Sequence, residues 1–113
     1  MLLQEVENQN ALDHLNDSYL KSFGYEALFL PTENSAVGCA VLSREPVLSA
    51  SSHAVNLAGQ VMGRNITAVE IVPRAGTGRL LIFVNHWKSK LGGAEATEPA
   101  RTVSYTHLTL PTN

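Results

Sequence analysis

Five consecutive apolar residues, Leu80–Val84, constrain the fold of this chain more than any other feature. A run of this length without a polar interruption is typical of a β-strand that is buried on both faces. The turn cluster Ala75–Gly78 precedes it, and the apolar segment Ile66–Val72 lies on the other side of that turn. We therefore expect an antiparallel hairpin whose open end brings Arg64 close to His86.

The rest of the chain predicts one helix and further short strands. Asn8 or Asn10 is placed to cap the helix, apolar residues follow at helical spacing, and Gly24 is placed to end it. One helix followed by mainly hairpin-linked strands predicts a mixed-sheet α/β or α+β layer fold. The other predicted strands are Leu2–Val6, Tyr25–Leu30, Cys39–Ser43 and Val47–Asn56, with a polar loop at Thr32–Ala36 and a small-residue connection at Leu57–Gly63.

Composition excludes several classes of protein. The chain has 113 residues, which is about one small domain, and a net charge of -2. This balance provides no basic surface for strong non-specific binding of nucleic acid. No apolar run approaches the roughly 20 residues that span a bilayer. Cys39 is the single cysteine, which excludes a disulfide scaffold and a cysteine-based zinc site within the chain.

The last eleven residues differ from the rest, because no charged residue occurs after Arg101. The codons GTC TCT TAT ACA CAT CTG ACG CTG CCG ACG, from a common sequencing-library adapter, translate into Val103–Thr112 without a mismatch. We therefore expect residues 103–113 to be a non-native tail and exclude them from predictions of fold and function. Residues 1–102 are then expected to be part of a domain that continues in a longer parent protein.

Chemically capable side chains follow the predicted strands. Glu5 comes after the apolar pair at the start of the chain, and Asn85 and His86 come directly after Leu80–Val84. Sites gather beyond strand ends in open α/β sheets, because side chains can leave the sheet there and converge. A carboxylate can hold Mg²⁺, Arg64 can bind phosphate oxygens, and a histidine can exchange a proton near neutral pH. Together they suit phosphate-ester chemistry.

Each of these residues also has a purely structural interpretation, and spacing alone does not decide between the two. Glu5 can be a solvated strand end, Arg64 a partner of a surface carboxylate, His86 a hydrogen-bonded histidine beneath Trp87, and Lys88 and Lys90 a solvated rim.

Four segments resemble the endonuclease/exonuclease/phosphatase family, whose fold is shared with deoxyribonuclease I. Leu-Gln-Glu-Val at the start resembles one motif of the family, and Val84–Lys90 is similar to the Val-Asn-His-x-Lys-Ser-Lys segment of its bacterial, often extracellular, nuclease-like branch. Val37–Arg44 and Gly63–Ile66 are similar to two further segments, in family order. The segments span nearly all of the chain up to Arg101.

The resemblance implies half of a two-sheet α/β sandwich of the deoxyribonuclease I type and in-line attack of water on a phosphodiester. It implies that Glu5 is a ligand of Mg²⁺, or of Mn²⁺ or Ca²⁺, and that His86 is a catalytic histidine. It assigns supporting roles in the active site to Arg64 and Asn85, and Lys88 and Lys90 are candidates for binding the substrate phosphate. The implied substrate is nucleic acid or another phosphodiester.

Two departures from the family pattern weaken the resemblance, namely Val37 in place of an arginine and Asn65 in place of an acidic residue. The family's Asp-x-Asn motif and its terminal Asp-His pair belong to the second half of the domain, beyond Arg101. We therefore expect this chain to be inactive by itself and marginally stable.

Three other hypotheses remain open. The parent protein can be a phosphatase or lipid phosphodiesterase of the same family. It can be a non-catalytic binding module that lost the second-half ligands. Finally, the chain can be a small α+β domain that matches the motifs by chance. The compartment is undetermined, with secretion of the parent protein as one option.

Overall fold

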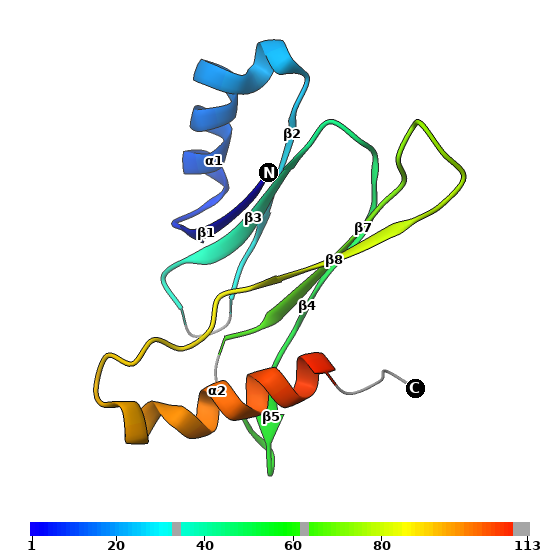
Figure 1. Cartoon of the computed structure of the whole chain (residues 1–113). Helices are drawn as coiled ribbons and strands as arrows, with labels where there is room; N and C mark the ends of the chain where they lie inside the picture. Colours follow the sequence, from blue (N-terminus) through cyan, green and yellow to red (C-terminus); the bar gives the residue numbers. More distant parts are fainter. Residues whose placement is uncertain (33–34, 62–63, 110–113) are drawn as a thin grey trace.

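Two antiparallel sheets of three strands each form a mixed α/β layer arrangement, which confirms the predicted fold class (Figure 1). The computed structural model describes residues 1–32, 35–61 and 64–109. The strand order is β1-β3-β2 in the first sheet and β4-β7-β8 in the second. The strands are β1 Leu2–Val6, β2 Glu26–Leu30, β3 Gly38–Ser43, β4 Val47–His53, β7 Ile66–Ile71 and β8 Leu80–Asn85, with a two-stranded ribbon of β5 Asn56–Leu57 and β6 Gln60–Val61.

These bounds follow the predicted strands closely, except that the strand expected over Val47–Asn56 ends at His53. Parts of the two predicted connections, residues 33–34 and 62–63, lie outside the described residues.

The helix α1, Gln9–Leu15, begins where a local cap allows it. The side chain of Asn8 accepts a hydrogen bond from the backbone N–H of Ala11 at 2.9 Å, so Asn8 rather than Asn10 is the cap. The helix continues through a π-helical turn η1, Asn16–Leu20, and a 3-10 turn η2, Lys21–Phe23. It ends at Gly24, whose φ of 75° is the left-handed conformation that glycine adopts without steric cost.

The central strand β3 holds the layers together, because every one of its residues is buried. On one face, Cys39 and Val41 join the core between the two sheets, where they meet Val69 and Val84 of the second sheet. On the other face, Ala40 and Leu42 pack against α1 through Leu12. Alternate side chains of a strand point to opposite faces, so one strand contributes to both cores.

The strand β8 is not buried on both faces, and the expectation from its apolar run is wrong for this structure. The exposed fractions of Leu80, Leu81 and Phe83 are 51%, 57% and 44%, whereas Val84 is buried. Ile82 and Val84 pack in the core between the sheets, so the alternate residues Leu81 and Phe83 lie on the face turned away from that core, and Leu80 is the first residue of this edge strand. Leu2 in β1, also an edge strand, is 47% exposed. An apolar surface of this kind on an edge strand is prone to association.

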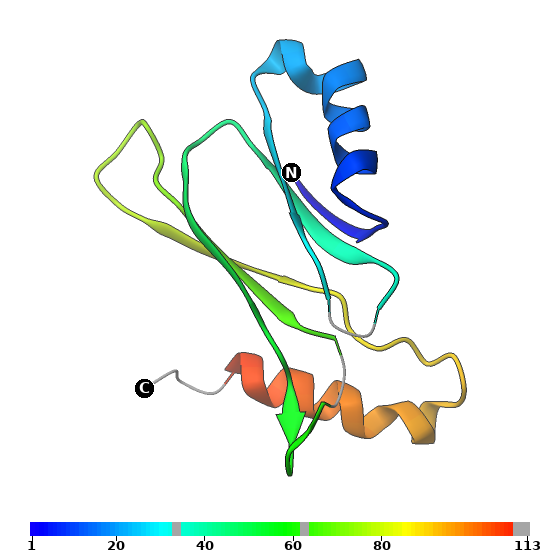
Figure 2. The same cartoon turned by 180° about the vertical axis from the view of Figure 1, so that it is seen from behind.

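A second helix, α2, spans Ala94–Thr109. It lies at the opposite end of the molecule from α1 in both views (Figures 1 and 2). It crosses the predicted boundary at residue 102, and residues 110–113 lie outside the described residues. The non-native origin of residues 103–113 stays a prediction. Neither helix described by the structure has the length and hydropathy that a membrane span requires.

Replacing Gly38 with alanine is expected to destabilise the fold. A Cβ atom at this position would stand 2.4 Å from the backbone oxygen of Leu30 and 2.8 Å from the ring of Phe29. Because backbone atoms cannot move away cheaply, we expect Gly38→Ala to lower the free energy of unfolding by about 1–3 kcal/mol. Urea denaturation followed by circular dichroism measures this change.

Gly78→Ala is the matched control, since a Cβ atom there would meet nothing within 4 Å. We expect its free energy of unfolding to be unchanged or slightly higher. Equal losses in both variants would show that the close approach at Gly38 does not limit the packing.

Candidate functional site

Glu5 reaches the site because β1 contains a bulge. The pairing of β1 with β3 shifts register between Leu3 and Val6, and Glu5 has a φ of 58°. Leu3 and Val6 both pack against the α1 side of the first sheet, although their spacing in a regular strand would place them on opposite faces. The bulge absorbs this difference and re-aims the residue within it. A left-handed φ is uncommon outside glycine, and such strain tends to collect at functional sites.

Arg64 and His86 come together at the open end of the β7–β8 hairpin, as the sequence predicts. Ile66 pairs with Asn85 in this hairpin, so the residue entering β7 and the residue leaving β8 lie at the same end. The guanidinium Nη1 of Arg64 lies 2.5 Å from Nε2 of His86. The register of one hairpin therefore sets the contact between a permanent cation and an imidazole.

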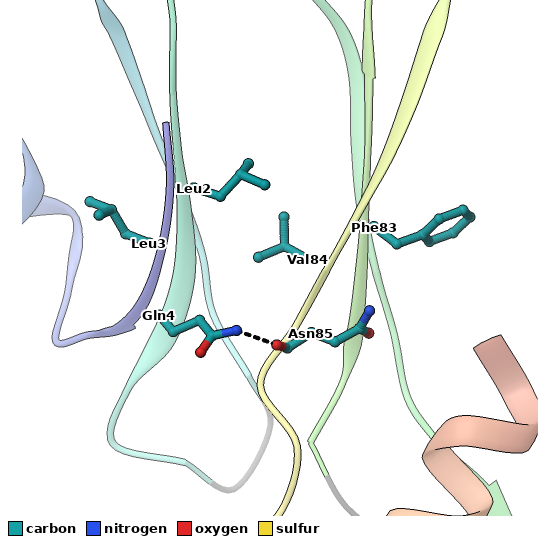
Figure 3. Close-up of a pocket in the computed structure, with 6 residues that line it drawn as sticks. All are labelled: Leu2, Leu3, Gln4, Phe83, Val84 and Asn85. Carbon is teal, nitrogen blue, oxygen red and sulfur yellow. Dashed lines mark hydrogen bonds between the residues drawn. The ribbon is translucent and has the colours of Figure 1, made fainter.

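Contacts between the two sheets complete the site. Oε1 of Glu5 lies 3.2 Å from Nε2 of His86. Beside this contact, the side-chain amide of Gln4 donates a hydrogen bond to the backbone oxygen of Asn85, which ties β1 to β8 (Figure 3). Next to these contacts lies an open hollow of about 450 Å³ between the two edge strands, lined by Leu2, Leu3, Gln4, Phe83, Val84 and Asn85.

A single nitrogen, Nε2 of His86, therefore faces both a cation and an anion. When Nε2 carries no proton, it accepts a hydrogen bond from Arg64. When Nε2 is protonated, it donates to the carboxylate of Glu5. The side chain of His86 is 17% exposed and that of Glu5 is 69% exposed, so the carboxylate stands toward solvent and the imidazole lies behind it.

Burial lowers the pKa of His86 from its ordinary value of 6.5, and the charge of Arg64 lowers it further. The carboxylate of Glu5 acts in the opposite direction, through its charge and its hydrogen bond. The net shift is downward, so the imidazole is mainly neutral at pH 7, and its unprotonated Nε2 can accept the hydrogen bond from Arg64. A neutral imidazole beside a carboxylate and a guanidinium can accept a proton and can contact a phosphate.

The other predicted residues lie outside this contact group. The side chain of Asn85 points away from Gln4 and from the hollow (Figure 3). Its Oδ1 is buried without a hydrogen-bond partner among the described residues. Lys88 and Lys90 are exposed in the loop between β8 and α2. The structure thus brings together Glu5, Arg64 and His86, and it does not bring Asn85 into the same group.

Three polar residues next to the site were not assigned a role from the sequence. Gln4 bridges the two sheets through its hydrogen bond to Asn85. In the sequence, only the neighbouring carboxylate of Glu5 was considered as a functional group. Asn65 and Thr67 are buried at the start of β7, and the amide of Asn65 donates to the hydroxyl of Ser52 at 2.8 Å. Two polar residues two positions apart in an apolar strand share one face. That spacing is the signal that points to a polar patch on the inner face of β7.

The donors present fit a magnesium ion only in part. Among the described residues there is no group of three or more His, Cys, Asp or Glu side chains that could hold a metal. Glu5 supplies one exposed carboxylate. Mg²⁺ is commonly held by one or two carboxylates together with water and substrate phosphate oxygens, so a single carboxylate is a sufficient first ligand. Ca²⁺ takes six to eight oxygen ligands and fits this donor set less well.

The two neighbours of His86 are expected to shift its pKa in opposite directions. In Arg64→Met the pKa of His86 should rise, because a nearby positive charge is removed. In Glu5→Gln it should fall, because the attraction to a carboxylate and a hydrogen bond to it are lost. Titration of the histidine ring signals by NMR measures both changes, in the absence of added metal ions. Shifts of the same sign in both variants would contradict the shared-nitrogen geometry.

The lowered pKa of His86 also determines how the free energy of unfolding changes with pH. In the folded chain its pKa lies below the ordinary value of 6.5, so between these two values the unfolded chain binds more protons. The stabilisation from the neutral imidazole is therefore complete above pH 6.5 and is lost as pH falls through the folded pKa. His86→Gln should flatten this part of the stability profile.

Comparison with known proteins identifies the family of this chain. A family model described as the Endonuclease/Exonuclease/phosphatase family matches residues 1–110. Comparisons with curated proteins and with solved structures gave no significant match. The match covers both sheets and all three residues of the contact group. The chain therefore belongs to the endonuclease/exonuclease/phosphatase family.

Proposed function

We propose that this chain is the N-terminal part of a divalent-metal-dependent phosphodiesterase, specifically an endo- or exonuclease. Membership of the family indicates a hydrolase of phosphoric esters. The observation that carries the finer proposal is the meeting of Glu5, Arg64 and His86 from two sheets at one nitrogen atom. The three side chains supply an anion for a metal, a cation for a phosphate and a group that exchanges a proton.

Each of the three residues has a distinct proposed role. Glu5 holds Mg²⁺ or Mn²⁺, which when bound polarises a phosphate oxygen and offsets its charge. Arg64 presents a planar group with several N–H donors to the remaining phosphate oxygens. Its contact with His86 orients the guanidinium before substrate arrives. Preorganised charge of this kind stabilises the transition state without a reorganisation cost.

His86 acts close to the scissile phosphate. Because its pKa is lowered, its neutral form predominates near pH 7 and Nε2 is able to take a proton. Once protonated, Nε2 is stabilised by the carboxylate of Glu5 at 3.2 Å. The imidazole also adds positive charge where negative charge builds on phosphate oxygens. These contributions support attack of water in line with the leaving oxygen.

Two observations bear on the substrate. Lys88 and Lys90 lie exposed just beyond His86, and this favours a polyanionic substrate such as nucleic acid. The near-neutral charge of the whole chain does not favour it. A phosphatase or lipid phosphodiesterase of the same family is therefore the alternative, and a non-catalytic binding module is the alternative from another class.

Binding of Mn²⁺ to the 113-residue chain is expected to depend on Glu5. A bound paramagnetic ion should broaden the NMR signals of Glu5 and His86 first, because these side chains lie 3.2 Å apart. Glu5→Gln should remove this selective broadening. Glu7→Gln is the matched control, since Glu7 is an exposed carboxylate two residues away outside β1, and it should leave the broadening intact. Equal broadening in both variants would place the ion elsewhere.

Activity is expected from the parent protein rather than from this chain alone. In Mg²⁺ the parent protein should cleave DNA, and His86→Ala should lower kcat by about 10²–10⁴-fold, as for loss of a general acid–base group. Parallel assays on DNA and on phospholipid separate the nuclease from the lipid phosphodiesterase. Cleavage of plasmid DNA by the 113-residue chain, abolished by Glu5→Ala, would overturn the view that half of the site is missing. Metal binding with no hydrolysis by the parent protein would favour the binding module.

A further inference from the structure

An exposed aromatic residue directly follows His86, a member of the contact group of Glu5, Arg64 and His86, along the chain. Trp87, the only tryptophan in the sequence, follows His86 directly and is 39% exposed. Its ring meets that of Tyr105 at a centroid distance of 6.2 Å and an interplanar angle of 81°. This contact is edge-to-face rather than stacked. Tyr105 belongs to the expected non-native tail, so a role for Trp87 in the parent protein does not depend on this contact.

Trp87 is adjacent in the chain to His86, the residue that is proposed to contact the phosphate. Adjacent Cα atoms are about 3.8 Å apart, so the indole begins one residue from the imidazole that faces Arg64 and Glu5. A phosphodiester that contacts His86 has a nucleoside on each side. A nucleoside beside that phosphate is the part of such a ligand that the indole could contact.

Exposed cations continue from the aromatic residue along the same loop. Lys88 and Lys90 are exposed, and the serine between them is exposed as well. A groove that binds single-stranded nucleic acid combines positive charge along the backbone with aromatic side chains on which bases stack. The sequence Trp87-Lys88-Ser89-Lys90 presents both features within four residues, next to the imidazole.

We propose that Trp87 is a stacking surface for an unpaired base beside the scissile phosphate, and that Lys88 and Lys90 bind the adjoining phosphates. The substrate is then single-stranded nucleic acid, because in a duplex both faces of each internal base are already covered. This inference rests on the proposed phosphodiesterase site, and it adds the strandedness of the substrate and a residue that determines it.

A lipid membrane is the alternative ligand for the loop that carries Trp87. Tryptophan, lysine and an exposed leucine also occur where proteins touch membranes, and Leu91 is 85% exposed. Insertion into a bilayer requires the aromatic ring to project from the surface. Trp87 is instead only 39% exposed, which suits stacking of a flat ligand better than insertion.

Fluorescence of the 113-residue chain tests the proposal directly, because Trp87 is the single tryptophan. The titrations contain EDTA, so that cleavage plays no part. A 12-nucleotide oligothymidylate should quench the fluorescence. An abasic strand of the same length and charge should bind about tenfold more weakly, in line with the usual contribution of one stacked base. The oligothymidylate annealed to its complement should also bind more weakly than the free strand.

Variants separate stacking from charge, with the anisotropy of a fluorescein-labelled oligothymidylate as the readout. Trp87→Leu should weaken binding about tenfold, and Trp87→Phe should recover part of the loss. Tyr19→Leu is the matched control, because Tyr19 is an exposed aromatic residue on η1, and affinity should not change. The double variant Lys88→Gln/Lys90→Gln should reduce the slope of log affinity against log salt by about 1.4.

Several results would overturn the proposal. Equal affinity for the abasic strand, or no effect of Trp87→Leu, would exclude stacking. A fluorescence change with vesicles of phosphatidylcholine and phosphatidylserine but not with the oligothymidylate would assign the loop to a lipid surface. If the oligothymidylate binds as expected but the parent protein cleaves no phosphodiester, the proposed function fails and the stacking surface stands. If the parent protein cleaves nucleic acid without any preference for unpaired bases, the stacking proposal fails and the proposed function stands.

Discussion

The burial of β3 on both faces is the constraint on which the rest of the structure depends. Its alternate residues supply the core between the sheets and the core beneath α1. Its two edges pair with β1 and β2. The strand is therefore in contact with other elements on both faces and along both edges, and its residues are small or of medium size. Gly38 lies at its start because the backbone of Leu30 approaches too closely for any side chain.

The candidate site follows from how β1 meets this strand. β1 must place Leu3 and Val6 on the α1 side, and a regular strand cannot do so with two residues between them. The bulge solves this packing problem and at the same time turns Glu5 toward the second sheet. Glu5 adopts a φ of 58° in this bulge and contacts His86, and its neighbour Gln4 donates a hydrogen bond to the backbone of Asn85. Packing and site geometry are thus two results of one backbone irregularity.

Local signals predicted much of the fold. A short polar side chain at Asn8 and a left-handed glycine at Gly24 mark the helix ends, since both act within a few residues. The turn before Leu80 and the pairing of β7 with β8 made the approach of Arg64 to His86 predictable. The exposure of β8 was not predictable, because an apolar run does not reveal whether a second layer covers it. The outward direction of the Asn85 side chain depends on which face of β8 turns inward.

The sequence by itself determined the first helix, most of the strands, the β7–β8 hairpin and the identity of the three groups that carry the proposed chemistry, because those depend on neighbours along the chain. Only the tertiary structure decided that Glu5 reaches the same nitrogen atom as Arg64. That contact needs a bulge in one sheet and the packing of that sheet against another. Such long-range geometry results from how two cores are filled together, and no local pattern encodes it.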